Sequence, residues 1–289
     1  MKGVVLAGGL GTRLHPLTKV TNKHLLPVYK KPMIYYPLES LVEAGIAEIM
    51  IVTGGNNAGD FLRLLGNGRE FGLPHLNYTY QEGEGGIADA LGLCRDFVDE
   101  DRVAVVLGDN IVQMSIREHV EAYGAQETGA RILLKEVPDP ERFGVPRLEG
   151  DRITEIIEKP EVAPSVYAVT GIYFYDNRVL EIAAGLKPSA RGELEITDVN
   201  LAYLEAGDLR VELIGRGVAW LDTGTHDSLL QACTFVEALQ ERQGLKIACL
   251  DEIAYLKGWI SREHLERLGK AMSKSSYGAY LLRIAEEEH

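Results

Sequence analysis

The sequence of 289 residues contains little cysteine, no long apolar run and no segment of low complexity. Cys94, Cys233 and Cys249 are odd in number and far apart, which argues against a disulfide framework and against a zinc site. No run approaches the ~18 consecutive apolar residues of a membrane span. The N-terminus enters a strand pattern directly, without the apolar region of a signal peptide. These absences favour a cytoplasmic protein with reduced thiols and no membrane partner.

Acidic residues are missing from the first 38 positions, although the chain as a whole is acidic. Its 30 Lys and Arg against 43 Asp and Glu give a formal net charge of −13. The first 38 residues nevertheless carry six cations, which are Lys2, Arg13, Lys19, Lys23, Lys30 and Lys31. Positive charge is therefore concentrated where a polyphosphate could bind, while the acidic remainder disfavours nucleic acid as a partner.

Short apolar runs alternate with amphipathic segments through the first half of the chain. We expect strands at Gly3–Leu6, Glu48–Val52, Leu76–Tyr80 and Val103–Leu107, and helices at Ile34–Ala44, Ala58–Leu65 and Ile87–Phe97. Apolar strands separated by helices predict an α/β fold with a Rossmann-like, doubly wound, mostly parallel sheet. Ligands of such a sheet bind at the carboxyl ends of its strands.

The second half of the chain is richer in strands, which indicates an inserted β region. These strands are expected at Ala130–Glu136, Ile153–Glu158, Ala168–Tyr175 and Val211–Ile214, before another that ends at Leu221. From about Asp227 the pattern is mostly helical, with Gln243-Gly244 as a stop signal for the first helix. Without a linker or internal repeat, the simplest organisation is one main domain at 1–226 with a helical C-terminal extension at 227–289 packed on it.

A glycine-rich turn follows the first strand directly. Gly8, Gly9 and Gly11 let backbone N–H groups approach phosphate oxygens without a Cβ atom in the way. Arg13 offers a planar fork of donors and Lys23 a point charge. The segment GGLGTRL lacks the Gly-Lys-Ser/Thr ending of a P-loop, and the third glycine of a Rossmann fingerprint is replaced by leucine. The glycines alone could form a tight turn, but the acid-free row of cations favours a nucleoside triphosphate site.

Two carboxylates follow apolar strands. Asp109 ends the segment VAVVLGD and Asp222 ends VAWLD, so both are expected at the ligand-binding edge of the sheet. Oxygen ligands of this kind suit Mg²⁺, which keeps several waters and binds substrate phosphate alongside one or two carboxylates. An Asp after a strand more often forms a turn or caps a helix. The residues alone leave both interpretations open.

Long motifs follow one another in a fixed order along almost the whole chain. They are LAGGLGTRL, KHLLPV, KPMIYYP, LGDN, FGV, EKP, YAVTGIYFYD, RGELEITDVN, AWLDTGTHDSLL and GLKIACLDEIAY. This series resembles the sugar-phosphate nucleotidylyltransferases, specifically the short bacterial form of the glucose-1-phosphate thymidylyltransferases. The resemblance implies Mg²⁺-dependent transfer of a thymidylyl group from dTTP to glucose 1-phosphate, which gives dTDP-glucose and pyrophosphate.

The resemblance also implies roles for individual residues. Arg13 and Lys23 would hold the triphosphate and stabilise the leaving pyrophosphate, and Lys159 would hold the sugar phosphate. Asp109 and Asp222 would bind the metal. The implied nucleotide-binding residues are Gly8, Gly9, Gly11, Thr12, Gln81 and Gly86. The implied sugar-binding residues, within the inserted β region and beside it, are Asn110, Gly144, Glu158, Val169 and Thr170.

Gln81, Asp89 and His24 bear on base recognition and on proton transfer. The amide of Gln81 offers a donor and an acceptor, which match the edge of thymine or uracil, although an isolated Gln is more often simply exposed. Asp89 stands where a Gln is common in the family, so the choice between thymine and uracil stays open. His24 also replaces a common Gln. It is not expected to act as a base, because the attacking phosphate is already an anion.

Two alternative functions remain open. A UTP-dependent uridylyltransferase acting on glucose 1-phosphate would use the same chemistry. A nonenzymatic nucleotide-sensing regulatory protein could share the fold, since fold does not fix activity. Such proteins commonly lose catalytic charges. This chain keeps all five implied by the resemblance, which favours the enzyme; they are Arg13, Lys23, Asp109, Lys159 and Asp222.

The family resemblance extends to assembly and pathway. It implies a homotetramer with the C-terminal helices at an oligomer interface, and a place in dTDP-rhamnose biosynthesis for cell-surface polysaccharide. The segment IVQMSI at 111–116 differs from the aromatic, glycine-containing stretch that helps to form a second nucleotide site in bacterial members. We therefore do not expect feedback inhibition by dTDP-rhamnose.

Overall fold

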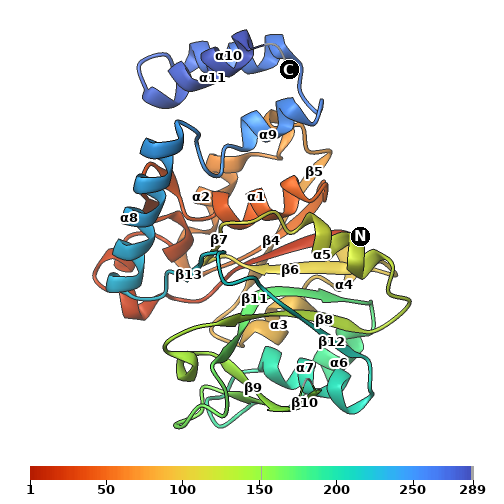
Figure 1. Ribbon diagram of the computed structural model, residues 1–289. Helices are drawn as coiled ribbons and strands as arrows, with labels where there is room; N and C mark the ends of the chain where they lie inside the picture. Colours follow the sequence, from red (N-terminus) through yellow and green to blue (C-terminus); the bar gives the residue numbers. More distant parts are fainter. Residues whose placement is uncertain (151, 288–289) are drawn as a thin grey trace.

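A seven-stranded sheet forms the centre of the computed structural model, which describes residues 1–150 and 152–287 (Figure 1). The strands, in spatial order, are β12 (Leu209–Leu213), β8 (Ala130–Glu136), β11 (Tyr167–Tyr175), β6 (Val103–Leu107), β1 (Lys2–Ala7), β4 (Glu48–Gly54) and β5 (His75–Gln81). β11 pairs antiparallel with β6 and β8, and the other neighbours pair in parallel. This arrangement confirms the predicted α/β fold with a mostly parallel sheet.

Helices cover both faces of the sheet (Figure 1). One face packs against α3 (Ile87–Gly92), α4 (Arg95–Val98), α6 (Val179–Gly185) and α7 (Ile196–Glu205). The other packs against α1 (Tyr35–Glu43), α2 (Ala58–Leu65), α5 (Arg117–Gly124) and α9 (Leu250–Leu256). In β1, Val4 belongs to the first core and Val5 to the second. Successive side chains of a strand point to opposite faces, so a sheet covered on both sides needs strands that are apolar throughout.

The structure differs from the sequence pattern in some local details. The helix expected at Ile87–Phe97 is divided into α3 and α4, because α3 ends at Gly92, a residue of low helix propensity. Helices α5, α6 and α7 were not expected. Short 3₁₀ turns also occur, at Thr12–Leu14, Leu17–Lys19, Lys23–Leu25, Gly55–Asn57, Arg69–Phe71 and Pro140–Arg142.

Small antiparallel sheets supplement the central one. β9 (Gly144–Glu149) pairs with β10 (Arg152–Glu158), and their register sets Glu158 opposite Gly144. β7 (Asn110–Val112) pairs with β13 (Trp220–Asp222), which sets Asp222 opposite Asn110. A third pair joins β2 (Pro27–Val28) to β3 (Lys31–Pro32). The registers of the first two pairs thus bring together residues that the sequence motifs leave far apart.

The C-terminal part is helical, as expected. α8 (His226–Gln243) packs on the segment between Leu14 and Met33 and ends at Gly244, which has the left-handed φ of 70° typical of a helix stop. α9, α10 (Arg262–Ala271) and α11 (Ser276–Glu286) share a separate apolar cluster, at the top of Figure 1. The domain boundary at 226/227 stays a prediction, and residues 288–289 of the predicted extension lie outside the described part.

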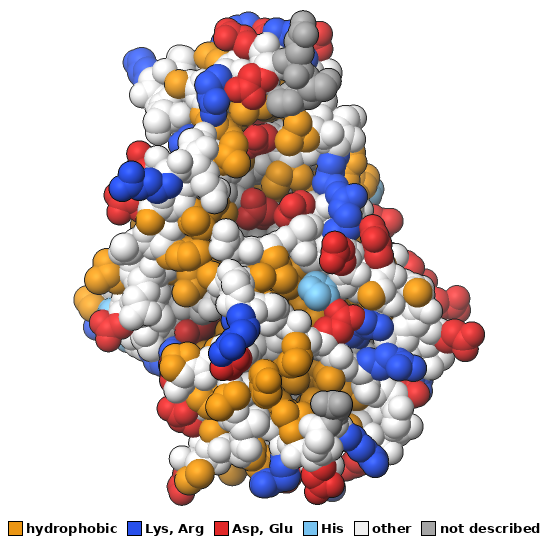
Figure 2. All heavy atoms as spheres, in the orientation of Figure 1, with side chains coloured by type: hydrophobic (Ala, Val, Ile, Leu, Met, Phe, Trp, Pro, Cys, Tyr) orange, Lys and Arg blue, Asp and Glu red, His pale blue; other side chains and the backbone are white. Residues whose placement is uncertain are grey.

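None of the described helices combines the length and the apolar content that a bilayer crossing requires. The face drawn in Figure 2 carries acidic and basic side chains interspersed with apolar ones. Large apolar side chains that reach the surface include Leu213, Leu230 and Leu256. Such exposure is ordinary for a folded chain, because polar groups are too few to cover the whole surface.

The close contact between α10 and α11 yields a stability prediction. A Cβ atom at Gly278 would lie 2.3 Å from the carbonyl oxygen of Met272 and 2.7 Å from that of Gly269. We expect Gly278→Ala to lower the free energy of unfolding by about 1–3 kcal/mol, measured by urea denaturation. The control is Gly59→Ala in α2, where the added Cβ meets nothing within 4 Å. Equal effects of the two substitutions would contradict the packing described.

Candidate active site

The glycine-rich loop leaves β1 with two residues in left-handed conformation. Gly9 has a φ of 84° and Gly11 a φ of 62°, and Gly11 begins the 3₁₀ turn Thr12–Leu14. A Cβ atom at Gly11 would lie 3.0 Å from Cβ of Lys23 and 3.1 Å from Cγ2 of Thr18. Only glycine combines this backbone conformation with so close an approach. The loop is therefore packed directly against the segment that carries Lys23.

Lys23 is the first residue of the 3₁₀ turn Lys23–Leu25. Its Nζ lies 2.7 Å from Oδ2 of Asp109, which follows β6. The turn is held by Asn22, whose Oδ1 accepts a hydrogen bond from the backbone N–H of His24 and whose Nδ2 donates to the carbonyl of Gly54. These contacts join the segment around Lys23 to the end of β4 and to the turn after β6.

Asp109 remains ionised although its side chain is only 21% exposed. Burial alone would raise the pKa of its carboxyl, but the positive charge of Lys23 and hydrogen bonds from Lys23 and Asn110 hold this pKa well below its usual range. The Asn110 amide donates to Oδ1 over 3.0 Å. Thr223 donates through both its N–H and its hydroxyl to the backbone carbonyl of Asp109. This links the Asp109 turn to the chain just after Asp222.

Asp222, the second predicted metal ligand, is paired with an arginine that the sequence reasoning missed. Both Asp222 oxygens lie 2.9 Å from one guanidinium nitrogen of Arg142, while another Arg142 nitrogen lies 2.7 Å from Oδ2 of Asp139. Arg142 immediately precedes the FGV motif, which is the one signal that could have drawn attention to it. The guanidinium thus fixes the direction in which Asp222 presents its carboxylate.

The predicted sugar residues meet beside the β9–β10 hairpin. Oε1 of Glu158 lies 3.1 Å from Nζ of Lys159, and Oε2 accepts a 2.6 Å hydrogen bond from the hydroxyl of Thr197. A Cβ atom at Gly144 would lie 3.2 Å from that hydroxyl oxygen. Lys159 itself has a φ of 44°, an unfavourable conformation for a residue with a side chain. Strained residues of this kind cluster at ligand sites.

Asn110 connects Asp109 to β11. Its Oδ1 accepts hydrogen bonds from the Trp220 indole N–H at 2.6 Å and from the backbone N–H of Gly171 at 3.1 Å. The pairing of β11 with β8 is irregular between Val169 and Tyr173, and β-bulges often occur next to active sites. Val169 faces the site, whereas the Thr170 side chain is 0% exposed and does not line it.

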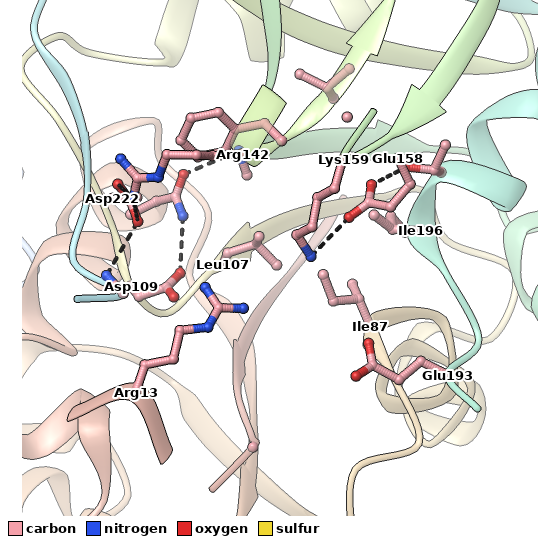
Figure 3. A pocket seen from close by; sticks show the side chains of 18 of the residues that line it. Arg13, Ile87, Leu107, Asp109, Arg142, Glu158, Lys159, Glu193, Ile196 and Asp222 are labelled. Carbon is pink, nitrogen blue, oxygen red and sulfur yellow. Dashed lines mark hydrogen bonds and ion pairs between the residues drawn. The ribbon is translucent and has the colours of Figure 1, made fainter. Parts of the chain in front are cut away.

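Two adjoining cavities collect the predicted residues. The first, about 350 Å³, is shown in Figure 3, where Arg13 and Lys159 point into it from different sides. Its lining includes Gly9, Gly11, Thr12, Arg13, Lys23, Asp109, Asn110, Gly144, Glu158, Lys159, Val169 and Asp222. The second, about 200 Å³, is lined in part by Gly8, Gln81 and Gly86 and shares Gly9, Lys23 and Asp109 with the first. Of the sixteen predicted site residues, Thr170 lies outside both linings.

The cations of the first cavity differ in their partners. Lys23, Arg142 and Lys159 each pair with a carboxylate. Arg13 is exposed, and no hydrogen bond or ion pair joins it to the rest of the described chain. Its planar fork of donors is therefore available to an anionic ligand.

The carboxylates of the cavity fit a divalent metal ion of the magnesium type. Asp109 and Asp222 line the same cavity and come from segments that are paired through β7 and β13. Residues 1–150 and 152–287 contain no group of three or more His, Cys, Asp or Glu side chains arranged to hold a metal. A pair of hard oxygen ligands suits Mg²⁺, which usually completes its shell with water and substrate phosphate.

His24 supports the Asp109 turn by packing. The imidazole is 1% exposed, and a Cβ atom at Gly108 would lie 2.6 Å from its Cδ2. Burial, assisted by the neighbouring charge of Lys23, lowers the pKa of His24 to about 3. The ring is thus neutral at ordinary pH. Its Nδ1 lies 2.9 Å from Oδ1 of Asn22, so its polar contact is with the protein.

Known proteins resemble this chain over most of its length. The family model described as nucleotidyl transferase matches residues 2–238. The chain is 50% identical to the glucose-1-phosphate thymidylyltransferase of Neisseria meningitidis serogroup A, over 99% of this chain and the whole of that relative. It is 47% identical to the protein of the same name from Mycobacterium tuberculosis, over 99% of both chains. These relatives confirm the resemblance predicted from the motifs.

Two solved structures are similar to the fold described here. A protein from Bacillus anthracis, assigned as a glucose-1-phosphate thymidylyltransferase and crystallised with a sucrose, is 52% identical with a TM-score of 0.77. That match covers 81% of this chain and 94% of the other. A UDP-glucose pyrophosphorylase complexed with UDP-glucose is 25% identical with a TM-score of 0.72, over 82% of this chain and 98% of the other.

The buried His24 yields a prediction about acid stability. Below pH ~6.5 a histidine in the unfolded chain takes up a proton, whereas His24 in the folded chain stays neutral down to about pH 3. Folding stability is therefore lost as the pH falls through this window. Between pH 8 and pH 5 we expect this histidine to cost the unsubstituted chain about 2 kcal/mol of unfolding free energy, a loss that His24→Gln avoids. The difference in unfolding free energy between the two proteins should therefore shift by that amount in favour of His24→Gln.

Urea unfolding at the two pH values tests this expectation. The matched control is His75→Gln, because His75 is exposed at the start of β5 and its replacement removes an imidazole without touching the site. A stability difference for His24→Gln that is the same at both pH values would show that the histidine does not resist protonation in the folded chain.

Proposed function

The chain belongs to the nucleotidyl transferase family, and we propose that it transfers a thymidylyl group from dTTP to glucose 1-phosphate, giving dTDP-glucose and pyrophosphate. Relatives of 47–50% identity that carry this activity in their names match nearly the full chain. The observation that carries the proposal is the shared cavity: Arg13 lies on one side and Lys159 on another, and Lys23, Asp109 and Asp222 line the same cavity.

The proposed reaction requires positioning and charge stabilisation rather than proton transfer. The attacking oxygen belongs to the phosphate of glucose 1-phosphate, which is already an anion. The main task of the protein is to bring this anion to the α-phosphorus of dTTP and to stabilise the departing pyrophosphate. Arg13 and Lys23 hold the triphosphate, and Lys159 holds the sugar phosphate. The neutral, enclosed His24 needs no role as a base.

Enzymes of this family use a divalent metal ion, and we assign Mg²⁺ to Asp109 and Asp222. When bound, the metal supplies positive charge to phosphate oxygens of the substrates. Arg142 then acts as a positioning residue, because its contact with both Asp222 oxygens sets the direction of that carboxylate. Lys23 plays the corresponding part at Asp109.

The remaining predicted residues divide between the two substrates. Gly8, Gly9, Gly11 and Thr12 face the triphosphate, and Gln81 with Gly86 faces the base. Asn110, Gly144, Glu158 and Val169 face the glucose ring. Glu158 accepts from sugar hydroxyls, and the absence of a side chain at Gly144 leaves the Glu158 and Thr197 oxygens uncovered.

The alternatives are less well supported. The UDP-glucose pyrophosphorylase neighbour is 25% identical, against 47–52% for proteins named for glucose-1-phosphate thymidylyl transfer. A nonenzymatic sensor has no need of Arg13, Lys23, Asp109, Lys159 and Asp222 in one cavity, and all five line it.

The family resemblance also supports proposals for pathway, location and assembly. The product dTDP-glucose is a precursor for dTDP-rhamnose and so for polysaccharide, and the proposed substrates are cytoplasmic metabolites. We assign the chain to a cytoplasmic homotetramer in which the helices beyond residue 226 contribute an interface.

Pyrophosphate release tests the proposed reaction directly. Glucose 1-phosphate is incubated with each of dTTP, UTP, CTP, ATP and GTP, with Mg²⁺ and with EDTA. We expect release to be fastest with dTTP and to disappear with EDTA, because metal charge is needed to bring the two phosphates together. A preference for UTP would assign the chain to uridylyl transfer. Nucleotide binding without turnover of any pair would favour the sensor.

Arg13→Ala tests the role of the unpaired cation. We expect kcat to fall by about 10²–10³, the loss typical of a preorganised group that stabilises charge in the transition state. Lys19→Ala is the matched control, since Lys19 is an exposed cation of the same segment that lines neither cavity. Near-normal turnover of Arg13→Ala would remove Arg13 from the proposed mechanism.

A further inference from the structure

We propose that Asp89 selects the base of the nucleotide by fixing the orientation of the Gln81 amide, so that only the amide oxygen is offered to the base. Asp89 would then be a positioning residue for a base with an N–H at its pairing edge, as thymine and uracil have at N3. This assignment rests on the proposed function, because it takes the cavity beside Gln81 as the base site.

The amide nitrogen of Gln81 is fully engaged by the protein. It donates to the carboxylate Oδ2 of Asp89 at 2.8 Å and to the backbone carbonyl of Gly86 at 2.9 Å. Both partners are acceptors only, so the nitrogen and not the oxygen must face them. The bond to the carboxylate is charge-assisted and therefore stronger than one between neutral groups.

The amide oxygen faces the other way. A Cβ atom at Gly8 would lie 2.6 Å from Oε1 of Gln81, so this oxygen is directed toward the start of the phosphate loop. Gln81 and Gly8 line the second cavity together, and no hydrogen bond within the described part of the chain ends on Oε1. Gln81 is 4% exposed, so its amide is shielded from bulk solvent and its orientation is set by the protein groups that it contacts. It thus presents one free acceptor to a ligand.

The backbone around Asp89 is shaped to hold its carboxylate in place. A Cβ atom at Gly85 would lie 2.3 Å from Oδ2 of Asp89, so the absence of a side chain there admits the carboxylate. Gly86 has a φ of 96°, and its own missing Cβ leaves room for the carbonyl of Leu194, 2.4 Å from that position. Gly85 and Gly86 thus allow the turn to pack closely against the Asp89 carboxylate and the Leu194 carbonyl.

A hydrogen-bond acceptor of fixed orientation discriminates between pyrimidines by whether their N3 carries a hydrogen. Thymine and uracil carry an N–H at N3 that can donate to Oε1, whereas cytosine has a lone pair at N3 and would face the oxygen without a hydrogen bond. Turning the amide to suit cytosine would set Oε1 against Asp89 and the Gly86 carbonyl, with loss of both hydrogen bonds. Asp89 therefore favours dTTP over dCTP but has no effect on dTTP against dUTP.

Equilibrium binding of dTTP, dUTP and dCTP to Asp89→Asn tests the proposal by calorimetry. An Asn can donate to a reversed Gln81, so we expect the dTTP/dCTP affinity ratio to fall by about tenfold. The dTTP/dUTP ratio should stay unchanged. A general loosening of the pocket would instead weaken all three nucleotides together. The control is Asp96→Asn, which removes an exposed carboxylate on α4 and should alter neither ratio.

A double-mutant cycle provides the second measurement. In a Gln81→Met background there is no amide to orient, so Asp89→Asn should leave the dTTP/dCTP ratio unchanged. Two results would overturn the proposal: equal binding of dTTP and dCTP by the unsubstituted chain, or an unchanged dTTP/dCTP ratio in Asp89→Asn. Because binding is measured without turnover, absence of pyrophosphate release would contradict the proposed function while leaving this test intact.

Discussion

The ion pair between Lys23 and Asp109 holds together the segments on which the site depends. Asp109 is mostly enclosed, and an enclosed charge is costly unless it is paired and hydrogen-bonded. Lys23 meets this need from the turn Lys23–Leu25, and the Asn110 amide meets it from β7. Thr223 donates to the carbonyl of the same aspartate and so brings in the end of β13. The carboxylate and the backbone carbonyl of one aspartate thus join the chain around Lys23, β7 and the chain after β13.

The same constraint organises the rest of the cavity. Arg142 faces Asp222 and Lys159 faces Glu158, so most charged side chains proposed to bind phosphate, metal or sugar also have a protein partner. Filling such a cavity is an exchange of partners, in which substrate groups replace contacts that the protein already makes. Arg13 differs, because its guanidinium has no such contact in the described chain, and it is the group best able to meet an incoming polyphosphate first.

The sequence predicts the parts of the fold and site that depend on local pattern. Central strands are recognisable because both faces are covered, and Asp109 is recognisable because it follows one of them. The expectation that Asp222 also follows a strand of the central sheet is wrong, because Asp222 ends β13, which pairs with β7 in a separate small sheet. The partners of these residues are not local: Arg142 precedes Asp222 by 80 positions, and no periodicity indicates which cation meets which carboxylate. Thr170 illustrates another limit. A motif names adjacent residues together, but neighbours in a strand point to opposite faces, so Val169 lines the cavity and Thr170 does not.

The left-handed backbone of Lys159 has a consequence for how this position can vary. Glycine or asparagine would adopt a φ of 44° with less strain than lysine, so stability taken alone favours their substitution. Neither offers a cation to the cavity. Under the role proposed for Lys159, only the chemistry keeps a lysine at this strained position, and a lineage that lost the chemistry would be free to replace it with glycine or asparagine.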